Sequence, residues 1–147
     1  MSLRKTFKTD RTAEVEGVEL EVGVNDHNGK PITVRIARMS PANKRYTKQL
    51  NKVTGPHQSA IQNGALDNDL ARKMLQEVFA DTILLGWGNL PKSELTGDDS
   101  DTDELEFTRE NVLALFTELP DLYDDWEARA QKAATFREQE RDVASGN

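Results

Sequence analysis

The stretch that decides the fold reads VELEVGVNDHNGKPITVRIA over residues 18–37. Apolar residues alternate with polar or small ones on both sides of a central turn, and this period of two is typical of half-buried β-strands. The stretch therefore predicts an antiparallel β-hairpin near the N-terminus. Its apolar positions are Val18, Leu20, Val22 and Val24 before the turn and Ile32, Val34 and Ile36 after it.

The length of the turn sets the register of this hairpin. A two-residue Asn28-Gly29 turn would mix apolar and polar residues on each face, whereas a three-residue His27-Asn28-Gly29 loop keeps the faces apart. We therefore predict the longer loop, with Gly29 in the left-handed conformation of a type I turn followed by a G1 bulge. Gly17 breaks the alternation and predicts a further bulge, and Pro31 suits an edge strand. The predicted pairs are Val24 with Ile32, Val22 with Val34 and Leu20 with Ile36.

Two helices are expected between the hairpin and residue 91. Ser40-Pro41 predicts the start of the first helix and Thr54-Gly55-Pro56 its end. The second begins near Asp67-Asn68, and its apolar positions cover an arc much wider than the ~100° stripe of a surface helix. We therefore expect it to be central, packed from two sides and ended by Gly86-Trp87-Gly88.

The rest of the chain divides into flanking segments and a C-terminal helical pair. Residues 1–12 show no period and predict a loose arm. Residues 92–104 are acidic and nearly free of apolar side chains, so they predict a weakly ordered acidic linker. A helical pair is expected over 105–141, with Thr108 capping its first helix and a frayed tail over 142–147. Its aromatic residues either form a small cluster of their own or complete the wide face of the central helix.

These elements predict an α+β protein that is mainly α. It begins with a part formed by the hairpin and two helices over residues 1–91, followed by the acidic linker and the helical pair, which gives about four helices. With 147 residues, of which 36% are hydrophobic and 31% charged, the chain suits one domain with a thin core.

Composition excludes several classes of function. The absence of cysteine removes disulfides, thiolate catalysis and cysteine-based metal sites, and leads us to expect a reducing compartment. No apolar run approaches the ~18–20 residues that a membrane span needs. The start of the chain lacks the apolar core of a secretory signal.

The net charge of −7 is unevenly distributed along the chain. Residues 1–60 carry a net charge of +5, whereas residues 61–147 carry −12. Because a general nucleic-acid binder is expected to be basic, this balance argues against that class. Either half is able to steer a partner of opposite charge.

No catalytic or metal-binding pattern is complete. The carboxylates of Asp99, Asp101, Asp103 and Glu110 have EF-hand spacing, but Glu104 occupies the position that requires glycine and no helix precedes the loop. The two histidines are expected in turns, and no phosphate loop or nucleophile elbow occurs. We therefore expect a protein that is not an enzyme and has no catalytic residue, metal or cofactor.

Two sets of residues are candidates for partner binding. The basic run on the first expected helix is able to contact phosphate, although its spacing equally suits a solvated helix face. Trp87, Phe107, Phe116 and Trp126 are candidate interface anchors, because aromatic residues are enriched at binding hot spots, but core packing is the alternative for each. The basic residues are Lys44, Arg45, Lys48 and Lys52.

Motifs spread in order over about residues 12–140 resemble those of phage tail assembly chaperones. In the first half they are IARMS (36–40), NKRY (43–46), LDN (66–68), VFADT (78–82) and LLGW (84–87). In the second half they are LEFTREN (105–111), LPDLYD (119–124) and FRE (136–138). The chain departs from the family pattern at residues 97–101, where a longer acidic stretch replaces a short Asp-Gly turn.

This resemblance implies a non-enzymatic helper in the morphogenesis of long-tailed phages. Such proteins bind the tape measure protein, keep its apolar helices from aggregating and help recruit tail tube subunits. The resemblance further implies a location in the host cytoplasm, absence from the mature virion and, in many members, a longer frameshifted form. Membrane and nucleic acid are not expected as partners, and a homo-oligomer is left open.

Two other functions remain as alternatives. One is a structural virion protein, such as a tail tube or head–tail connector subunit, in which the hairpin extends a ring of strands by edge pairing. The other is a regulator that binds phosphate through the basic helix. We rank the regulator last because the acidic second half repels polyanions.

Overall fold

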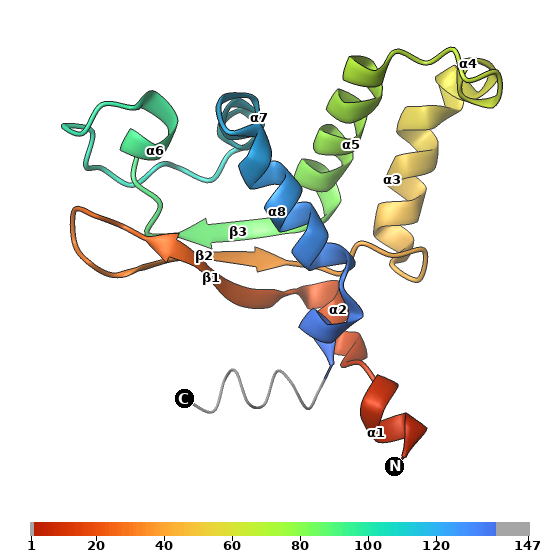
Figure 1. Cartoon of the computed structure of the whole chain (residues 1–147), viewed down its shortest axis with the longest axis horizontal. Coiled ribbons are helices and arrows are strands. Elements are labelled where there is room, and N and C mark those ends of the chain that lie inside the picture. The colour runs from red at the N-terminus through yellow and green to blue at the C-terminus, as the bar shows by residue number, and fades with distance from the viewer. Residues whose placement is uncertain (1, 138–147) are drawn as a thin grey trace.

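The hairpin is present in the computed structural model, which describes residues 2–137. Strands β1 (Val18–Val24) and β2 (Pro31–Ile36) pair antiparallel, and β3 (Leu84–Gly88) pairs antiparallel with the other side of β2 (Figure 1). The prediction that Gly86-Trp87-Gly88 only ends the central helix was therefore wrong. β3 satisfies backbone groups along the second side of β2 that would otherwise lack partners. Pro31 consequently starts the central strand of the sheet rather than an edge strand.

The predicted register of the hairpin was also wrong. Val18 pairs with Ile36 and Leu20 with Val34, and the register shifts between Glu21 and Gly23. The bulge therefore lies around Val22 and not at Gly17.

A longer turn than expected causes this register. The N–H of Asn25 donates to the carbonyl of Lys30 at 2.9 Å, and the N–H of Gly29 donates to the carbonyl of Asn25 at 2.8 Å. The left-handed conformation predicted for Gly29 is confirmed, since its φ is 69°.

Residues 2–12 are not the loose arm that we expected over 1–12. They contain helix α1 (Leu3–Phe7) and the start of helix α2 (Arg11–Glu16), whose N-caps are the side chains of Ser2 and Asp10. Gly17 ends α2 with a φ of 89° and leads directly into β1. The break in alternation at Gly17 thus marks a helix end.

Helix α3 (Lys44–Thr54) begins later than the predicted Ser40-Pro41 start. The buried Asn43 caps it instead, because its side chain accepts from the N–H of Tyr46 at 3.3 Å and donates to the carbonyl of Arg38 at 2.9 Å. The predicted end at Thr54 is confirmed. The chain then continues through a 3₁₀ helix, η1 (Gly55–His57), and a short helix, α4 (Gln58–Gln62), which we did not predict.

Helix α5 (Asn68–Thr82) starts where the sequence predicts, with Asp67 as its N-cap. It packs against α3 on one side and against helix α7 (Arg109–Glu118) and β3 on the other, which confirms a central helix covered from two sides. Its fully buried positions are Met74, Val78, Phe79 and Thr82.

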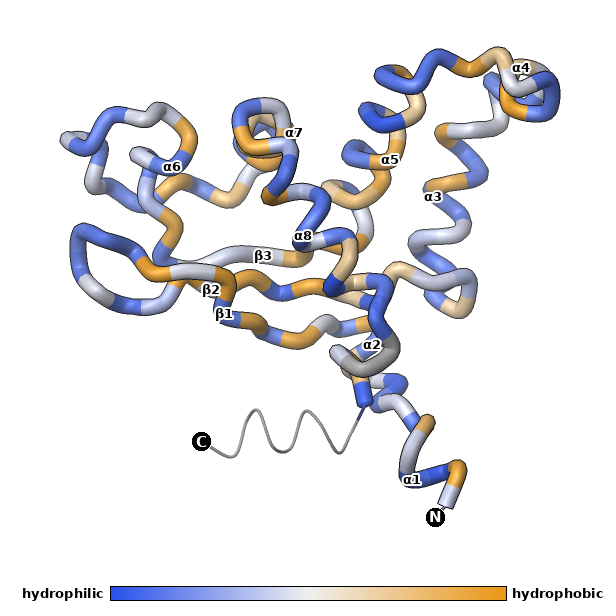
Figure 2. The backbone as a smooth tube through the Cα atoms, in the orientation of Figure 1, coloured by the Kyte–Doolittle hydropathy of each residue, from blue (hydrophilic) through white to orange (hydrophobic). Residues whose placement is uncertain are grey.

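Residues 92–104 have more structure than a weakly ordered linker. They include helix α6 (Ser93–Thr96), and the N–H of Lys92 donates to the carbonyl of Asp103 at 2.8 Å. Pro91 and Glu104 form an isolated antiparallel bridge. Figure 2 shows residues 92–104 as a mostly hydrophilic stretch beside the hairpin turn. Backbone hydrogen bonds hold this segment, and Leu95 packs against the core.

The C-terminal helical pair is present, but its second helix is shorter than expected. Thr108 caps α7 as predicted, and helix α8 (Pro120–Gln131) follows at the Leu119-Pro120 turn. A second 3₁₀ helix, η2 (Ala133–Phe136), replaces the predicted continuation and buries Phe136 completely. Positions 138–141 of the predicted helix and the predicted frayed tail, 142–147, lie outside the described residues.

The aromatic residues of the helical pair join the core of the N-terminal part. The ring of Phe79 on α5 lies 5.8 Å from that of Phe116 on α7 and 5.4 Å from that of Tyr123 on α8. Val34 and Ile36 of β2 belong to the same buried cluster. The helical pair thus completes the wide face of α5, the alternative that the sequence left open.

Candidate functional site

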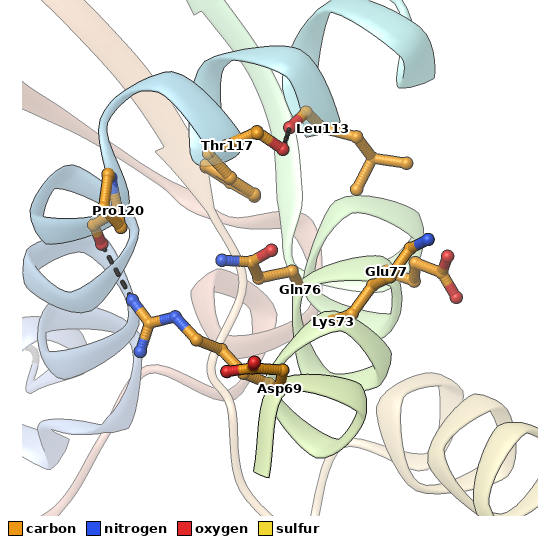
Figure 3. Close-up of a pocket in the computed structure, with 9 residues that line it drawn as sticks. Asp69, Lys73, Gln76, Glu77, Leu113, Thr117 and Pro120 are labelled. Atoms are coloured by element: carbon orange, nitrogen blue, oxygen red, sulfur yellow. Dashed lines mark hydrogen bonds between the residues drawn. The ribbon is translucent and has the colours of Figure 1, made fainter. Parts of the chain in front are cut away.

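An open groove between α5 and α7 has the lining of a binding site for apolar side chains (Figure 3). Its volume is about 370 Å³. The ring of Phe116 and the half-buried side chain of Leu113 supply its apolar lining. Polar and charged side chains of α5 form the opposite wall. We call this surface the α5–α7 groove, and it is lined by Asp69, Arg72, Lys73, Gln76, Glu77, Leu113, Phe116, Thr117 and Pro120.

Both signs of charge alternate along the α5 wall. Asp69, Lys73 and Glu77 follow one another at intervals of four residues, so they lie on the same side of the helix. An amphipathic helix that places apolar side chains in the groove would therefore meet partners for charges of either sign on its own polar face.

Arg72 is held in place at one end of the groove. Its guanidinium pairs with the carboxylate of Asp124 at 2.9 Å and donates to the carbonyl of Pro120 at 3.1 Å. The same group lies 5.6 Å from the ring centre of Tyr123, within the range of a cation–π contact. These contacts join α5 to the α7–α8 turn and fix that end of the groove.

The Tyr123 hydroxyl lies in a buried polar contact behind the groove. It donates a short hydrogen bond to the carboxylate of Glu127, one turn further along α8. Burial raises the pKa of this hydroxyl, and the hydrogen bond and the negative charge of Glu127 raise it further. Burial and the Glu127 charge likewise raise the pKa of Tyr46 on α3. Both hydroxyls are therefore neutral at physiological pH.

Two of the predicted anchor residues meet on β3. The rings of Trp87 and Phe107 lie 5.0 Å apart at 86°, an edge-to-face contact. Phe107 is 38% exposed and Trp87 is half-buried, so this pair presents apolar surface to solvent. Partner contact at Trp87 and Phe107 stays a prediction.

The other two predicted anchors lie in the core. Phe116 is 0% and Trp126 3% exposed, and their rings are 6.1 Å apart. The ring of Phe116 lines the α5–α7 groove but has no exposed surface, so the apolar side chains open to a partner there are Leu113 and Pro120. Arg72 and Leu113 were not among the site residues predicted from sequence, although the alternating charges of α5 were a signal for a solvent-facing wall.

A comparison with models of known protein families identifies the family of this chain. The family model described as the YdaY prophage protein matches residues 41–147, which is well over half of the chain. The chain belongs to the YdaY prophage protein family. It is therefore a phage-related protein. No curated protein and no solved structure matches it.

The family match covers the α5–α7 groove but not the hairpin. All groove residues, and both Trp87 and Phe107, lie within the matched part of this YdaY-family chain. Strands β1 and β2 precede it.

The acidic residues around α6 serve local structure in this member of the YdaY family. Asp101 accepts from the hydroxyl of Thr96 at 2.6 Å, and the carboxylate of Asp98 accepts from both the N–H and the hydroxyl of Ser100. These bonds to Ser100 lower the pKa of Asp98.

Among residues 2–137, no three His, Asp or Glu side chains are grouped so that they could hold a metal ion. Within the same range, no helix combines the length and apolar character of a membrane span.

Proposed function

We propose that this YdaY-family protein is a non-enzymatic phage tail assembly chaperone. In this role it binds the tape measure protein and helps recruit tail tube subunits in the host cytoplasm, and it leaves before the virion is complete. Its membership of a prophage family and the resemblance of its motifs over residues 12–140 support this function. The observation that carries the proposal is the α5–α7 groove, an open surface with an apolar side and a wall of mixed charge.

The groove suits apolar side chains that project from a partner helix. Leu113 is half-buried, so a partner side chain that covers it gains the free energy of apolar burial without any rearrangement of the core. The net charge of −7 opposes self-association while the partner is held. Together these features fit a carrier that covers the apolar helices of a tape measure protein.

Co-expression with the tape measure protein of the same phage tests the proposal. We expect the soluble fraction of that protein to rise and the two chains to co-purify. Unchanged solubility without co-purification would contradict the chaperone function.

The variant Leu113→Glu tests the groove, because it places a charge where an apolar side chain should bind. Ile61→Glu, at a 40% exposed residue of α4, is the matched control. If both variants keep the melting temperature of the parent protein and only Leu113→Glu loses the tape measure protein, the groove is the binding surface. If both variants retain the partner equally, the α5–α7 groove is not the binding surface, but the chaperone function is not contradicted.

A structural virion protein is the second candidate, and an edge of the sheet supports it. Among residues 2–137, β1 pairs with β2 only and is an edge strand of the three-stranded sheet. Such an edge is able to add a strand from another subunit. Mass spectrometry of purified virions separates the two functions: stoichiometric presence supports the structural protein, and absence supports the chaperone.

A further inference from the structure

A second groove lies between α3 and the C-terminal end of α5. Its volume is about 520 Å³, and we call it the α3–α5 groove. Three basic residues of α3 line it at intervals that place them on one side of the helix. The complete lining is Arg45, Lys48, Gln49, Lys52, Asp81 and Thr82.

Asp81 is the acidic residue of this lining, and other side chains already engage its carboxylate. Nε of Arg109 donates to Oδ1 at 2.7 Å, and Nη2 of Arg109 donates to Oδ2 at 3.3 Å. Gln49 donates to Oδ2 at 3.5 Å. The hydrogen bond to Asp81 raises the pKa of Arg109. The negative charge of Asp81 is thus matched by Arg109, while Arg45 donates to the backbone carbonyl of Asp81 at 3.1 Å.

Lys48 and Lys52 have no carboxylate within ion-pair distance among residues 2–137. Arginines elsewhere in the chain do pair, as Arg38 does with Glu14 at 3.4 Å and Arg129 with Asp125 at 3.1 Å. We call Arg45, Lys48 and Lys52 the basic stripe of α3. The chain carries 26 acids against 19 bases, so the basic stripe is not a consequence of overall composition.

The stripe also opposes the stability of its own helix. Lys48 and Lys52 are four residues apart, and like charges at that spacing weaken an isolated helix. α3 contains no fully buried residue, and its Tyr46 packs against the core as a partly buried side chain. An anionic ligand in the groove removes this repulsion.

We propose that the α3–α5 groove binds an acidic α-helical segment of a partner protein. Carboxylates spaced four residues apart on such a segment match the spacing of Lys48 and Lys52 along α3. The proposal concerns a surface separate from the α5–α7 groove and does not depend on the chaperone function.

The charge of the whole chain favours a short acidic segment over a nucleic acid. At physiological salt, charges interact over a Debye length of about 8 Å, so a segment held in the groove meets chiefly the local bases. A long polyanion would extend beyond the groove, where the acidic remainder of the chain repels it.

Fluorescence anisotropy with a defined probe tests the proposal. The probe is a fluorescein-labelled, alanine-based helical peptide of about 16 residues with glutamate at every fourth position. The variant Lys48→Glu/Lys52→Glu is compared with Lys5→Glu/Lys30→Glu, which changes two exposed bases outside the groove and alters the net charge equally. We expect the groove variant to bind the peptide about tenfold more weakly than the control variant does.

A gain of affinity provides an independent arm of the test. Asp81→Asn removes the acidic side chain of the groove and frees Arg109, so it should tighten binding of the same peptide. Equal weakening by the two charge-reversal variants would overturn the proposal, because only net charge would then matter. A single-stranded oligonucleotide that displaces the peptide at lower charge concentration would overturn it in favour of nucleic acid.

Discussion

The indole N–H of Trp87 donates a hydrogen bond of 2.8 Å to the backbone carbonyl of Leu105. This bond attaches β3 to the chain just after the acidic segment 92–104, which contains α6. Leu105 is 4% exposed and its own N–H donates to the carbonyl of Leu90 at 2.7 Å, so both backbone groups of this buried residue are satisfied. The bond therefore anchors the segment that leads into α7.

Removing this hydrogen bond should loosen the anchor. Trp87→Phe keeps an aromatic ring beside Phe107 but leaves the carbonyl of Leu105 without its donor, and we expect a loss of about 1–3 kcal/mol of unfolding free energy. Phe107→Leu is the matched control, since it keeps the hydrogen bond and loses only the ring contact, which is worth about 0.5–1.5 kcal/mol. Urea unfolding measures both. An equal or smaller effect of Trp87→Phe would show that the hydrogen bond adds nothing to the ring contact.

The core shared by α5, α7 and α8 should depend strongly on Phe116. Its ring is fully buried between those of Phe79, Tyr123 and Trp126, so Phe116→Ala leaves a cavity and should cost about 3–5 kcal/mol. Phe7→Ala on α1, where the ring is 60% exposed, should cost less than about 1 kcal/mol. Chemical denaturation with a single transition for each variant measures the difference. Similar costs for the two variants would contradict the shared core.

Gly17 should tolerate alanine much less well than Gly64 does. Both have a positive φ, 89° and 65°, which costs an alanine about 1 kcal/mol or more. At Gly17 the added Cβ would also lie 2.7 Å from Cγ of Arg35 and 2.9 Å from Cδ1 of Leu85, whereas at Gly64 no atom lies within 4 Å. The fall in melting temperature should therefore be larger for Gly17→Ala, and equal falls would mean that neighbouring side chains move aside freely.

The two tyrosines predict a loss of stability at alkaline pH. Burial raises the pKa of both Tyr46 and Tyr123 above the ordinary value of 10.0, so the folded state holds their protons more tightly than the unfolded state does. This contribution to stability is complete below pH 10 and is lost as the pH rises through the raised values. Absorbance should show the tyrosines ionising at a higher pH in the folded protein than in the urea-unfolded chain. Tyr123→Phe should reduce the loss of unfolding free energy at alkaline pH. An unchanged dependence of stability on pH would contradict a contribution from Tyr123.

Local sequence predicted the elements whose signals lie within one or two turns of chain. Thr108 caps α7 as expected, α5 begins at the predicted Asp67-Asn68 with Asp67 as its cap, and Pro120 lies in the first turn of α8. Such caps depend only on hydrogen bonds between neighbouring residues, so no tertiary contact is needed to foresee them.

The candidate site was only partly predictable, because it depends on contacts between segments that are far apart in the chain. Trp87 and Phe107 were candidate anchors because aromatic residues favour interfaces, and partner contact there stays a prediction. Their edge-to-face contact depends on β3, which the sequence did not predict. The α5–α7 groove requires two helices far apart in the chain, so its lining from Arg72 to Leu113 has no local signature.

What the sequence alone determined is the hairpin, the central helix and the α+β class, because alternation and helical periodicity follow from which side of each element is buried. Only the tertiary structure decided the register. The side chain of Asn89 donates to the carbonyls of Lys30 and Pro31, and Asn25 donates to the carbonyl of Asn89, so a residue beyond β3 holds the long hairpin turn. Because register depends on how the turn closes, and here contacts from a distant part of the chain close it, no pattern within residues 18–37 could reveal it.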